Sequence, residues 1–437
     1  MEVIIVGAGL AGCEAALQLA NKGIKVKLYE KKKTKKNEIQ KSDFFAELVC
    51  SNTFRSMSTQ NAVGILKKEL ELFNSFILDC AYKTAIPSDD ALAVDRETFS
   101  LLVEKLIREN ENIDIIEEEF KEFDEKIITL VTCGPLITPE FQNKINELIG
   151  NQKLFYLDAS SPIIEKNSID FSKVYYKSRH GDDKSYICIP LDEKEFEAFH
   201  SKLVDADVVK LKDFEKEIYF TGCQPIEQLA KVSKKSLLNG PMSPNNLENN
   251  KGVKPYAVVQ LRKDDAMDNL YNMVGFQTNI TWSEQQRIFS SLPGLENASF
   301  KRFGVMHKNN YINSPKILNK KLQVMRRKNI FFAGQITGVE GYIESFSSAI
   351  VASLGIISTI KKTKFLEIPS ETILGSLINY ITNSKIKKLK PMKANLGIIK
   401  QDFGIFPTKE EKNNFIYNRS IKVLKQYLKQ VEWSLKV

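Results

Sequence analysis

The first thirty residues alternate between apolar runs and glycine-containing turns. Val3 to Val6 form a short continuous apolar run, which is typical of a strand buried on both faces of a sheet. Residues 7–12 (GAGLAG) follow, and an Ala- and Leu-rich stretch over 13–22 favours a helix that ends at Gly23. A second apolar strand follows over 24–29. The pattern predicts a strand–helix–strand unit of the kind that builds parallel sheets.

Two later apolar strands have the same buried character. Residues 127–131 run towards Gly134, and residues 329–333 run into Gly334. Shorter segments predict helices over 61–73, 97–108 and 193–204, and a helix that residues 338–342 open and that runs to 360. They predict strands over 113–116, 175–176, 186–187, 218–220, 256–261 and 271–276. The strands of the middle segment look antiparallel and interrupt the parallel pattern. The sequence therefore predicts an α/β fold in which a doubly wound, Rossmann-like domain of glutathione-reductase type (1–165 and 300–437) holds an inserted mixed α/β domain (166–299).

The glycine turns supply candidate positions for binding a dinucleotide. Gly7 permits a tight turn, Gly9 lets a pyrophosphate approach the backbone, and Gly12 lets the helix pack on the strand. Glu30 ends the second strand roughly 20 residues beyond the glycines, where an acid accepts the ribose hydroxyls. The other predicted cofactor-binding residues are Ala8, Gly134, Gly334, Gly338, Gly341 and Tyr342.

The late strand that ends in Ala-Gly favours FAD as the dinucleotide. In flavoproteins of this type a glycine-started helix follows such a strand, and its positive N-terminal end suits the electron-rich pyrimidine edge of a reduced flavin. A simple NAD dehydrogenase or an S-adenosylmethionine-dependent methyltransferase has no need of residues 331–342. The three strands that meet Gly7, Gly134 and Gly334 therefore predict FAD binding.

Composition narrows the class of protein. The 437 residues are 43% hydrophobic and 27% charged, as in ordinary globular proteins. No apolar run approaches the 18 or more residues that a membrane span needs, and the first strand begins at the N-terminus, so we expect a cytoplasmic protein with no membrane partner. Six scattered cysteines without a CxxC pair and only three histidines predict no metal site.

The positive charge is concentrated at the C-terminus. The chain carries a net charge of +9, and residues 361–437 alone hold 16 Lys and Arg against 6 Asp and Glu. A basic segment of this size favours a polyanion such as RNA as partner, because each neutralised phosphate releases counterions. A lysine-rich, solvated helical surface is the alternative interpretation.

Several blocks of the sequence together resemble one family. They are VGAGLAGCEAA (6–16), FAELVCSNTFR (45–55), NAVGILKKEL (61–70), ALAVDR (91–96), FEKEIYFTGCQPIE (214–227), KPYAVVQLR (254–262), YNMVGFQT (271–278), GVMHKNNYINSP (304–315) and FFAGQITGVEGYIES (331–345). Across nearly its whole length the chain resembles the folate- and FAD-dependent RNA (uracil-5-)-methyltransferases of the TrmFO type. The resemblance implies FAD in the two-part domain, 5,10-methylenetetrahydrofolate as carbon donor, NAD(P)H as reductant and 5-methyluridine in RNA as product.

The same resemblance singles out two cysteines as catalytic. Uracil C5 becomes nucleophilic only after a group adds at C6, and a thiolate can add there and leave again. Cys50 and Cys223 match the two functional cysteines of the family. Which of them attacks C6 stays open: we favour Cys223, with Cys50 near the flavin as acid/base or as a second thiol. Cys13, Cys80, Cys133 and Cys188 are interpreted as inert, small buried residues.

Four further residues are weaker candidates for contacts with cofactor or substrate. Tyr342 either stacks on the isoalloxazine ring or packs in the core, and His307 either contacts folate or flavin or bonds the backbone. Arg96 is a candidate for contact with flavin phosphate or RNA. Trp282 is a candidate platform for folate or a base, although a packed aromatic residue is the plainer interpretation.

Departures from the family pattern bear on the RNA target. Residues 231–233 (KVS), 244–247 (PNNL) and 389–393 (LKPMK) differ from the usual family motifs, whereas the FAD motifs are intact. The target is therefore either the T-loop uridine 54 of tRNA or, for a paralogue, a uridine of 23S ribosomal RNA. Two other functions are kept as alternatives: an FAD-dependent NAD(P)H oxidoreductase without methyl transfer, and a non-enzymatic RNA-binding protein.

Overall fold

The larger body of the protein is built on a sheet of mostly parallel strands. The computed structural model describes residues 2–37, 39–150, 152–179, 185–209, 224–249 and 251–435. The sheet has the order β16 (Gln323–Val324), β17 (Arg327–Phe332), β7 (Ile128–Val131), β1 (Glu2–Val6), β2 (Lys25–Tyr29) and β6 (Ile113–Ile116). All neighbours pair in parallel except β16 and β17. The late strand β17 thus joins the N-terminal strands, as the hydrophobic pattern predicted.

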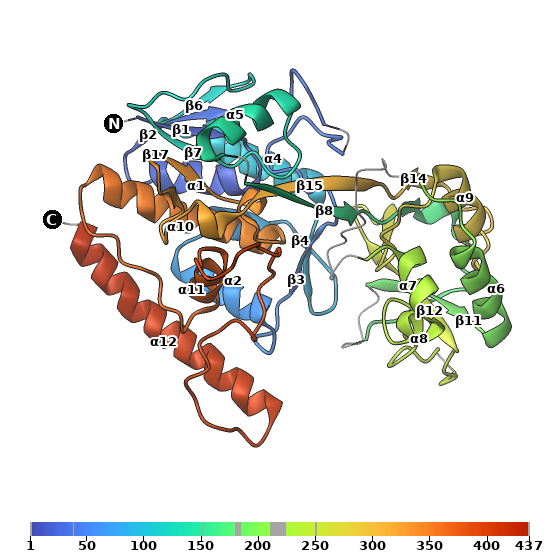
Figure 1. Ribbon diagram of the computed structural model, residues 1–437. Coiled ribbons are helices and arrows are strands. Elements are labelled where there is room, and N and C mark those ends of the chain that lie inside the picture. Colours follow the sequence, from blue (N-terminus) through green and yellow to red (C-terminus); the bar gives the residue numbers. More distant parts are fainter. Residues whose placement is uncertain are drawn as a thin grey trace.

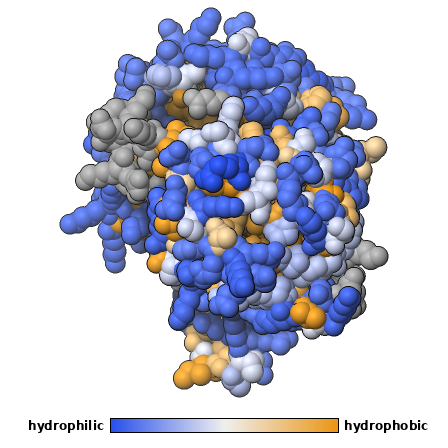
Figure 2. Space-filling view, turned by 90° about the vertical axis from the view of Figure 1, so that its right-hand side faces the viewer, coloured by the Kyte–Doolittle hydropathy of each residue, from blue (hydrophilic) through white to orange (hydrophobic). Residues whose placement is uncertain are grey.

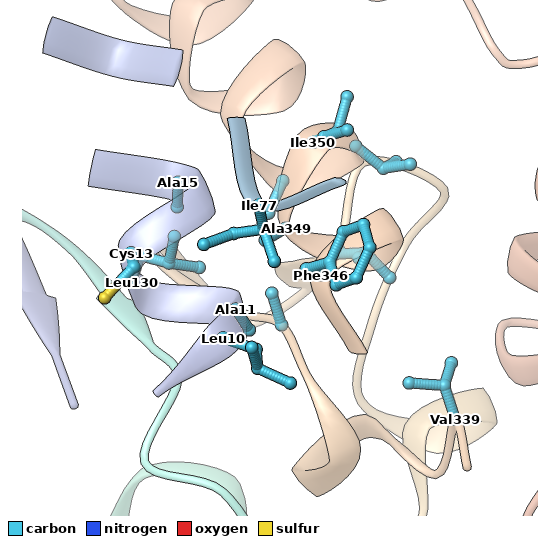
Figure 3. Close-up of a cluster of buried hydrophobic side chains, with 14 of the residues drawn as sticks. Leu10, Ala11, Cys13, Ala15, Ile77, Leu130, Val339, Phe346, Ala349 and Ile350 are labelled. Atoms are coloured by element: carbon cyan, nitrogen blue, oxygen red, sulfur yellow. The ribbon is translucent and has the colours of Figure 1, made fainter. Parts of the chain in front are cut away.

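Two helices pack against each other beside this sheet and form the centre of the core. The helix α1 (Leu10–Ala20) lies against α10 (Tyr342–Ile360), with Ala11, Phe346 and Ala349 among the buried side chains between them (Figure 3). The helix α10 is long and apolar enough to cross a membrane, but 78% of its apolar window is buried inside the fold. That burial identifies it as a core helix.

The remaining helices of the larger body cover the sheet and its flank. They are α2 (Ala62–Leu72), α3 (Phe76–Lys83), α4 (Arg96–Arg108), α5 (Pro139–Ile149), α11 (Ile373–Ile381) and α12 (Lys409–Leu435). The long helix α12 runs along the outside of this body, on the side away from the inserted domain (Figure 1). A small antiparallel sheet consists of β3 (Thr53–Ser56), β5 (Ala91–Val94) and β4 (Ala85–Ile86), and its strand β3 follows Cys50 closely in the sequence. The short 3₁₀ helices are η1 (Lys166–Ser168), η2 (Ser314–Lys316) and η3 (Gln335–Thr337).

The inserted domain is a separate antiparallel sheet with its own apolar core. Its order is β10 (Tyr175–Tyr176), β11 (Tyr186–Leu191), β12 (Ala257–Lys263), β13 (Leu270–Met273), β9 (Ile163–Glu165) and β14 (Phe300–Arg302). The helices α6 (Glu193–Val204), α7 (Ile226–Val232), α8 (Lys234–Leu238) and α9 (Trp282–Phe289) pack on it. The prediction of antiparallel strands at 175–176 and 186–187 is confirmed, because Tyr175 pairs with Cys188 and Tyr176 with Ile187. The predicted strand over 218–220 lies outside the described residues.

A two-stranded ribbon connects the two bodies. The strands β8 (Lys153–Ala159) and β15 (Met306–Ile312) pair antiparallel and extend from the larger body to the inserted domain (Figure 1). The division at 166 and 299 stays a prediction. The strands β9 and β14, which belong to the sheet of the inserted domain, lie just outside those bounds.

A buried carboxylate joins three helices of the larger body. Glu69 on α2 accepts the backbone N–H groups of Ile373 (2.7 Å) and Leu374 (2.8 Å), which begin α11, and the hydroxyl of Ser420 on α12. Glu69 is fully buried, and burial raises the pKa of its carboxyl to about 7.

We expect Glu69→Ala to lower the free energy of unfolding by about 3 kcal/mol, because it leaves several buried donors without an acceptor. The measurement is urea denaturation followed by circular dichroism. Glu71→Ala, on the exposed face of the same helix, is the matched control and should change stability by less than about 0.5 kcal/mol. Equal effects of the two substitutions would contradict the capping role of Glu69.

Candidate FAD and thiol site

The turn between β1 and α1 is shaped for an anionic group. Gly7 has φ +104°, in the region that favours glycine, and a Cβ on Gly12 would lie 1.8 Å from the carbonyl oxygen of Gly7. A Cβ on Gly9 would meet nothing within 4 Å, and no side chain caps the helix at Gly9. The first N–H groups of α1 therefore face an open space, where a phosphate group fits.

Glu30 stands beside this turn at the end of β2. Its carboxylate accepts the backbone N–H of Ala8 at 2.8 Å and that of Lys32 at 2.9 Å. Ala8 thus supports Glu30 rather than the pocket surface, whereas Glu30 and Gly9 both line the pocket. This placement of Glu30 fits the predicted contact with the ribose of a dinucleotide.

One pocket extends from this turn towards Cys50. Its walls come from segments that are far apart in the sequence: the first glycine turn, residues 47–55, residues 118–120, residues 132–138, the ribbon β8–β15, and residues 334–345. Of the predicted cofactor-binding residues, those on the pocket wall are Gly7, Gly9, Glu30, Gly134, Gly334, Gly341 and Tyr342. Gly12 and Gly338 lie behind the wall; a Cβ on Gly338 would meet Leu389 at 2.4 Å. Those two glycines serve packing.

The N-terminus of α10 and the Cys50 loop meet at one end of the pocket. Gly341 precedes the helix with φ 112° and provides no side-chain cap. The hydroxyl oxygen of Tyr342 accepts the backbone N–H of Cys50 at 2.8 Å, and its ring packs 5.8 Å from that of Phe54. Cys50 is half-buried and lines the pocket. The structure therefore brings Cys50, Tyr342 and a helix N-terminus together, while their contact with a flavin, including stacking of Tyr342 on the ring, stays a prediction.

A cluster of acid, phenol and amide lies next to Tyr342, and its acid and amide line the pocket. Tyr156 donates its hydroxyl hydrogen to Glu340, and the Gln335 amide donates to Tyr156 (2.6 Å) and to Glu340 (2.8 Å). Burial, helped by Glu344 and opposed by Lys393 and Arg55, raises the pKa of Glu340 to about 8. Burial therefore favours the protonated form of Glu340.

This protonation has a consequence for stability. Between pH 4.5, the usual pKa of a glutamate, and about 8, the folded chain retains a proton at Glu340 that the unfolded chain has lost. Stability therefore falls as pH rises through this window, by at most about 1.4 kcal/mol per pH unit, and levels off above it. We expect Glu340→Gln to flatten the decline of the thermal midpoint between pH 5 and 8. The exposed Glu111→Gln is the control, and parallel profiles for Glu340→Gln and the parent protein would contradict the assignment.

His307 lies on β15, in the ribbon β8–β15, and lines the same pocket. Its Nε2 is 3.8 Å from the carboxylate of Asp158, and Asn309 donates to that carboxylate at 3.2 Å. All three residues line the pocket. Sequence reasoning missed Asp158 and Asn309, although the apolar run over 154–157 that ends at Asp158 was a usable signal. A contact of His307 with folate or flavin stays a prediction.

Three candidates lie elsewhere. Trp282 begins α9 in the inserted domain, is 62% exposed and stacks on Phe303 with ring centres 6.0 Å apart. Arg96 lies outside the pocket lining and binds Asp264 and the Cys50 loop. Cys223 lies outside the described residues. Figure 2, which views the molecule from the side of the inserted domain, shows a largely hydrophilic surface with scattered apolar groups.

The parallel sheet, the glycine turn with its acid and the late glycine-started helix together define a two-part dinucleotide-binding protein of the Rossmann type. A family model, "Glucose inhibited division protein A" (GIDA), matches residues 2–364. The crystal structure of Aquifex aeolicus GidA in the form II crystal has the same fold, with a TM-score of 0.69 at 15% identity over 97% of this chain and 73% of that chain.

Full-length relatives give a narrower placement. The Mycoplasma mycoides subsp. mycoides SC protein named methylenetetrahydrofolate--tRNA-(uracil-5-)-methyltransferase TrmFO 2 is 58% identical over 98% of both chains. The Mesoplasma florum protein named as the same kind of methyltransferase, TrmFO 1, is 56% identical over 98% of this chain and 97% of its own. Bacillus subtilis (strain 168) TrmFO is 44% identical over 98% of this chain and 99% of its own. The chain belongs to the TrmFO type of the GidA family. The predicted resemblance and fold class are confirmed.

Proposed function

We propose that this chain is an FAD-dependent RNA methyltransferase. It takes a one-carbon unit from 5,10-methylenetetrahydrofolate, uses NAD(P)H as reductant and forms 5-methyluridine in tRNA, in the cytoplasm. The observation that supports the proposal is the hydrogen bond from the backbone N–H of Cys50 to the Tyr342 hydroxyl at the N-terminus of α10, because it holds the segment with Cys50 at the end of the pocket that suits a flavin ring. The printed names of the full-length relatives support the substrate and the carbon donor.

The residues of the pocket fit FAD. The uncapped N-terminus of α1 suits the pyrophosphate, Glu30 suits the adenosine ribose, and the uncapped N-terminus of α10 suits the pyrimidine edge of the flavin. When bound, FAD supplies the hydride that turns the transferred carbon into a methyl group, with NAD(P)H as the source of electrons.

The thiols would activate uracil. A thiolate adds to C6, the S–C6 bond forms, and the electrons of the C5=C6 bond make C5 nucleophilic. C5 then bonds the methylene carbon, a base removes the C5 proton as the bond between that carbon and its carrier nitrogen breaks, and addition of a hydride to the carbon re-forms the C5=C6 bond and expels the thiolate. We assign the addition to Cys223 and the proton transfer at C5 to Cys50, which lines the pocket.

The RNA target is proposed as uridine 54 of the tRNA T-loop, since the relatives are named for tRNA. The basic segment 361–437, which contains the exposed lysines of α12, supports contact with RNA phosphates. A uridine of 23S ribosomal RNA is the competing target, and an FAD-dependent NAD(P)H oxidoreductase without methyl transfer is the competing activity.

The test uses the purified full-length protein with FAD, NAD(P)H, methylenetetrahydrofolate and an unmodified tRNA transcript. Nucleoside mass spectrometry should detect 5-methyluridine, which should vanish when uridine 54 is replaced by cytidine or the folate is omitted. Product in a 23S RNA fragment alone would move the target to ribosomal RNA. Oxidation of NAD(P)H without 5-methyluridine in either RNA would overturn the proposal in favour of the oxidoreductase.

A further inference from the structure

The loop that carries Cys50 is held by two arginines from different parts of the fold. Arg96, at the start of α4, donates to the carbonyl oxygens of Leu48 and, at 3.2 Å, of Cys50. Arg302, on β14 of the sheet in the inserted domain, donates to the carbonyl oxygen of Val49 at 2.8 Å. Three successive carbonyls of the loop, at residues 48–50, therefore face guanidinium groups.

Arg96 is itself tied to the inserted domain. Its Nε and Nη2 atoms both lie 3.0 Å from the carboxylate oxygens of Asp264, which follows β12 and is 3% exposed. Such a two-pronged pair fixes orientation as well as distance. Asn52 adds a second link, because its amide donates to the carbonyls of Val94 and Lys263, both at 3.1 Å. The Cys50 loop is thus fixed from both bodies.

Two positive side chains dominate the charge around this loop. The charged and titratable groups facing one another here are Arg96, Arg302, Asp264, Tyr342 and Cys50 itself. Burial and the neighbouring charge of Arg96 lower the pKa of Arg302, whereas Cys50, Tyr342 and Asp264 oppose that change. An anion at Cys50 therefore relieves the repulsion between the two guanidinium groups, while Asp264 offsets part of the positive charge.

We propose that Arg96 and Arg302 are positioning residues that hold the Cys50 loop at the junction of the two bodies and stabilise the thiolate of Cys50. Asp264 limits this stabilisation of the thiolate, because it orients Arg96 and neutralises part of its positive charge. The proposal rests on the proposed function only for the chemical use of Cys50. The geometry and charge of the loop can be measured without RNA or folate.

The experiment follows alkylation of Cys50 by iodoacetamide in the FAD-loaded protein between pH 5 and 10, resolved by peptide mass spectrometry. The thiolate attacks the methylene carbon and iodide leaves, so the rate reports the thiolate fraction. We expect Arg302→Gln to move the midpoint to higher pH and to slow alkylation at pH 7 by about 3- to 10-fold. Arg302→Lys should restore the midpoint of the parent protein.

Asp264→Asn provides a test of opposite sign. It retains the shape of the side chain but removes the negative charge, so the midpoint should move to lower pH. Arg287→Gln, on the exposed face of α9 where Arg287 pairs with Glu284, should leave the midpoint unchanged. A midpoint unaffected by Arg302→Gln, or shifts of equal sign for Arg302→Gln and Asp264→Asn, would overturn the proposal. If the midpoints shift as expected but the parent protein forms no 5-methyluridine, the result would instead count against the proposed function.

Discussion

Gly9→Ala is expected to leave the protein folded and to weaken FAD binding by about 10- to 100-fold, the equivalent of about 1–3 kcal/mol of steric crowding. The Cβ atom of an alanine at this position meets no protein atom within 4 Å, so the chain itself tolerates it. The methyl group would occupy the open space before α1, where the pyrophosphate needs the backbone. Fluorescence titration of the apoprotein with FAD measures the loss.

Gly12→Ala separates packing from binding. Its Cβ would lie 1.8 Å from the carbonyl oxygen of Gly7 and 2.8 Å from the Thr132 hydroxyl, so the turn must shift. We therefore expect both a lower thermal midpoint and a loss of FAD. Gly404→Ala, where a Cβ also meets nothing within 4 Å, is the control for alanine substitution as such. An apoprotein destabilised equally by Gly9→Ala and Gly12→Ala would contradict this division of roles.

Cys50→Ala is expected to reduce formation of 5-methyluridine by about 10²- to 10⁴-fold, the usual contribution of a positioned acid or base. FAD should remain bound, because the predicted phosphate and ribose contacts lie at the glycine turn between β1 and α1 and at Glu30, away from Cys50 in the pocket. The visible absorbance spectrum of the purified variant and nucleoside mass spectrometry measure the two properties separately. Cys223→Ala should likewise abolish methyl transfer with FAD retained.

Cys133→Ala is the sharpest control for the role of the Cys50 thiol. Cys133 also lines the pocket, and burial raises the pKa of its thiol, which keeps it protonated and unreactive. The variant should keep near-normal turnover. If it lost as much activity as Cys50→Ala, proximity to the pocket rather than thiol chemistry would explain both effects. Normal turnover of Cys50→Ala would eliminate the catalytic role of that residue.

The local sequence was sufficient to predict those turns, helices and strands that a single short segment forms. The glycine turn that follows the first strand, the helix that ends before Gly23 and the predicted strand over 127–131 were all found from the pattern of apolar residues and glycine, although the helix begins at Leu10, earlier than predicted. The predicted helices over 61–73, 97–108 and 193–204 were likewise close to α2, α4 and α6. These features depend on backbone conformation and on burial of one face, which neighbouring residues determine.

The polar contacts of the site needed the folded chain. Tyr156 and Glu340 are 184 residues apart, and their hydrogen bond depends on the ribbon β8–β15 reaching the start of α10. Arg96 and Asp264 are 168 residues apart, so the sequence suggested a phosphate or RNA contact for Arg96, whereas the fold gives it a carboxylate and the Cys50 loop. The periodicity of a local segment does not predict which charged or polar side chains from distant segments will come into contact in the fold.

The sequence by itself therefore determined the family, the dinucleotide turn and the two candidate cysteines. The tertiary structure decided which glycines face the pocket, which acid is buried there, and how the Cys50 loop is fixed between the two bodies. The reason is physical. A turn or a helix is stabilised by residues close in the chain, whereas burial and the field of neighbouring charges come from segments that only folding brings together.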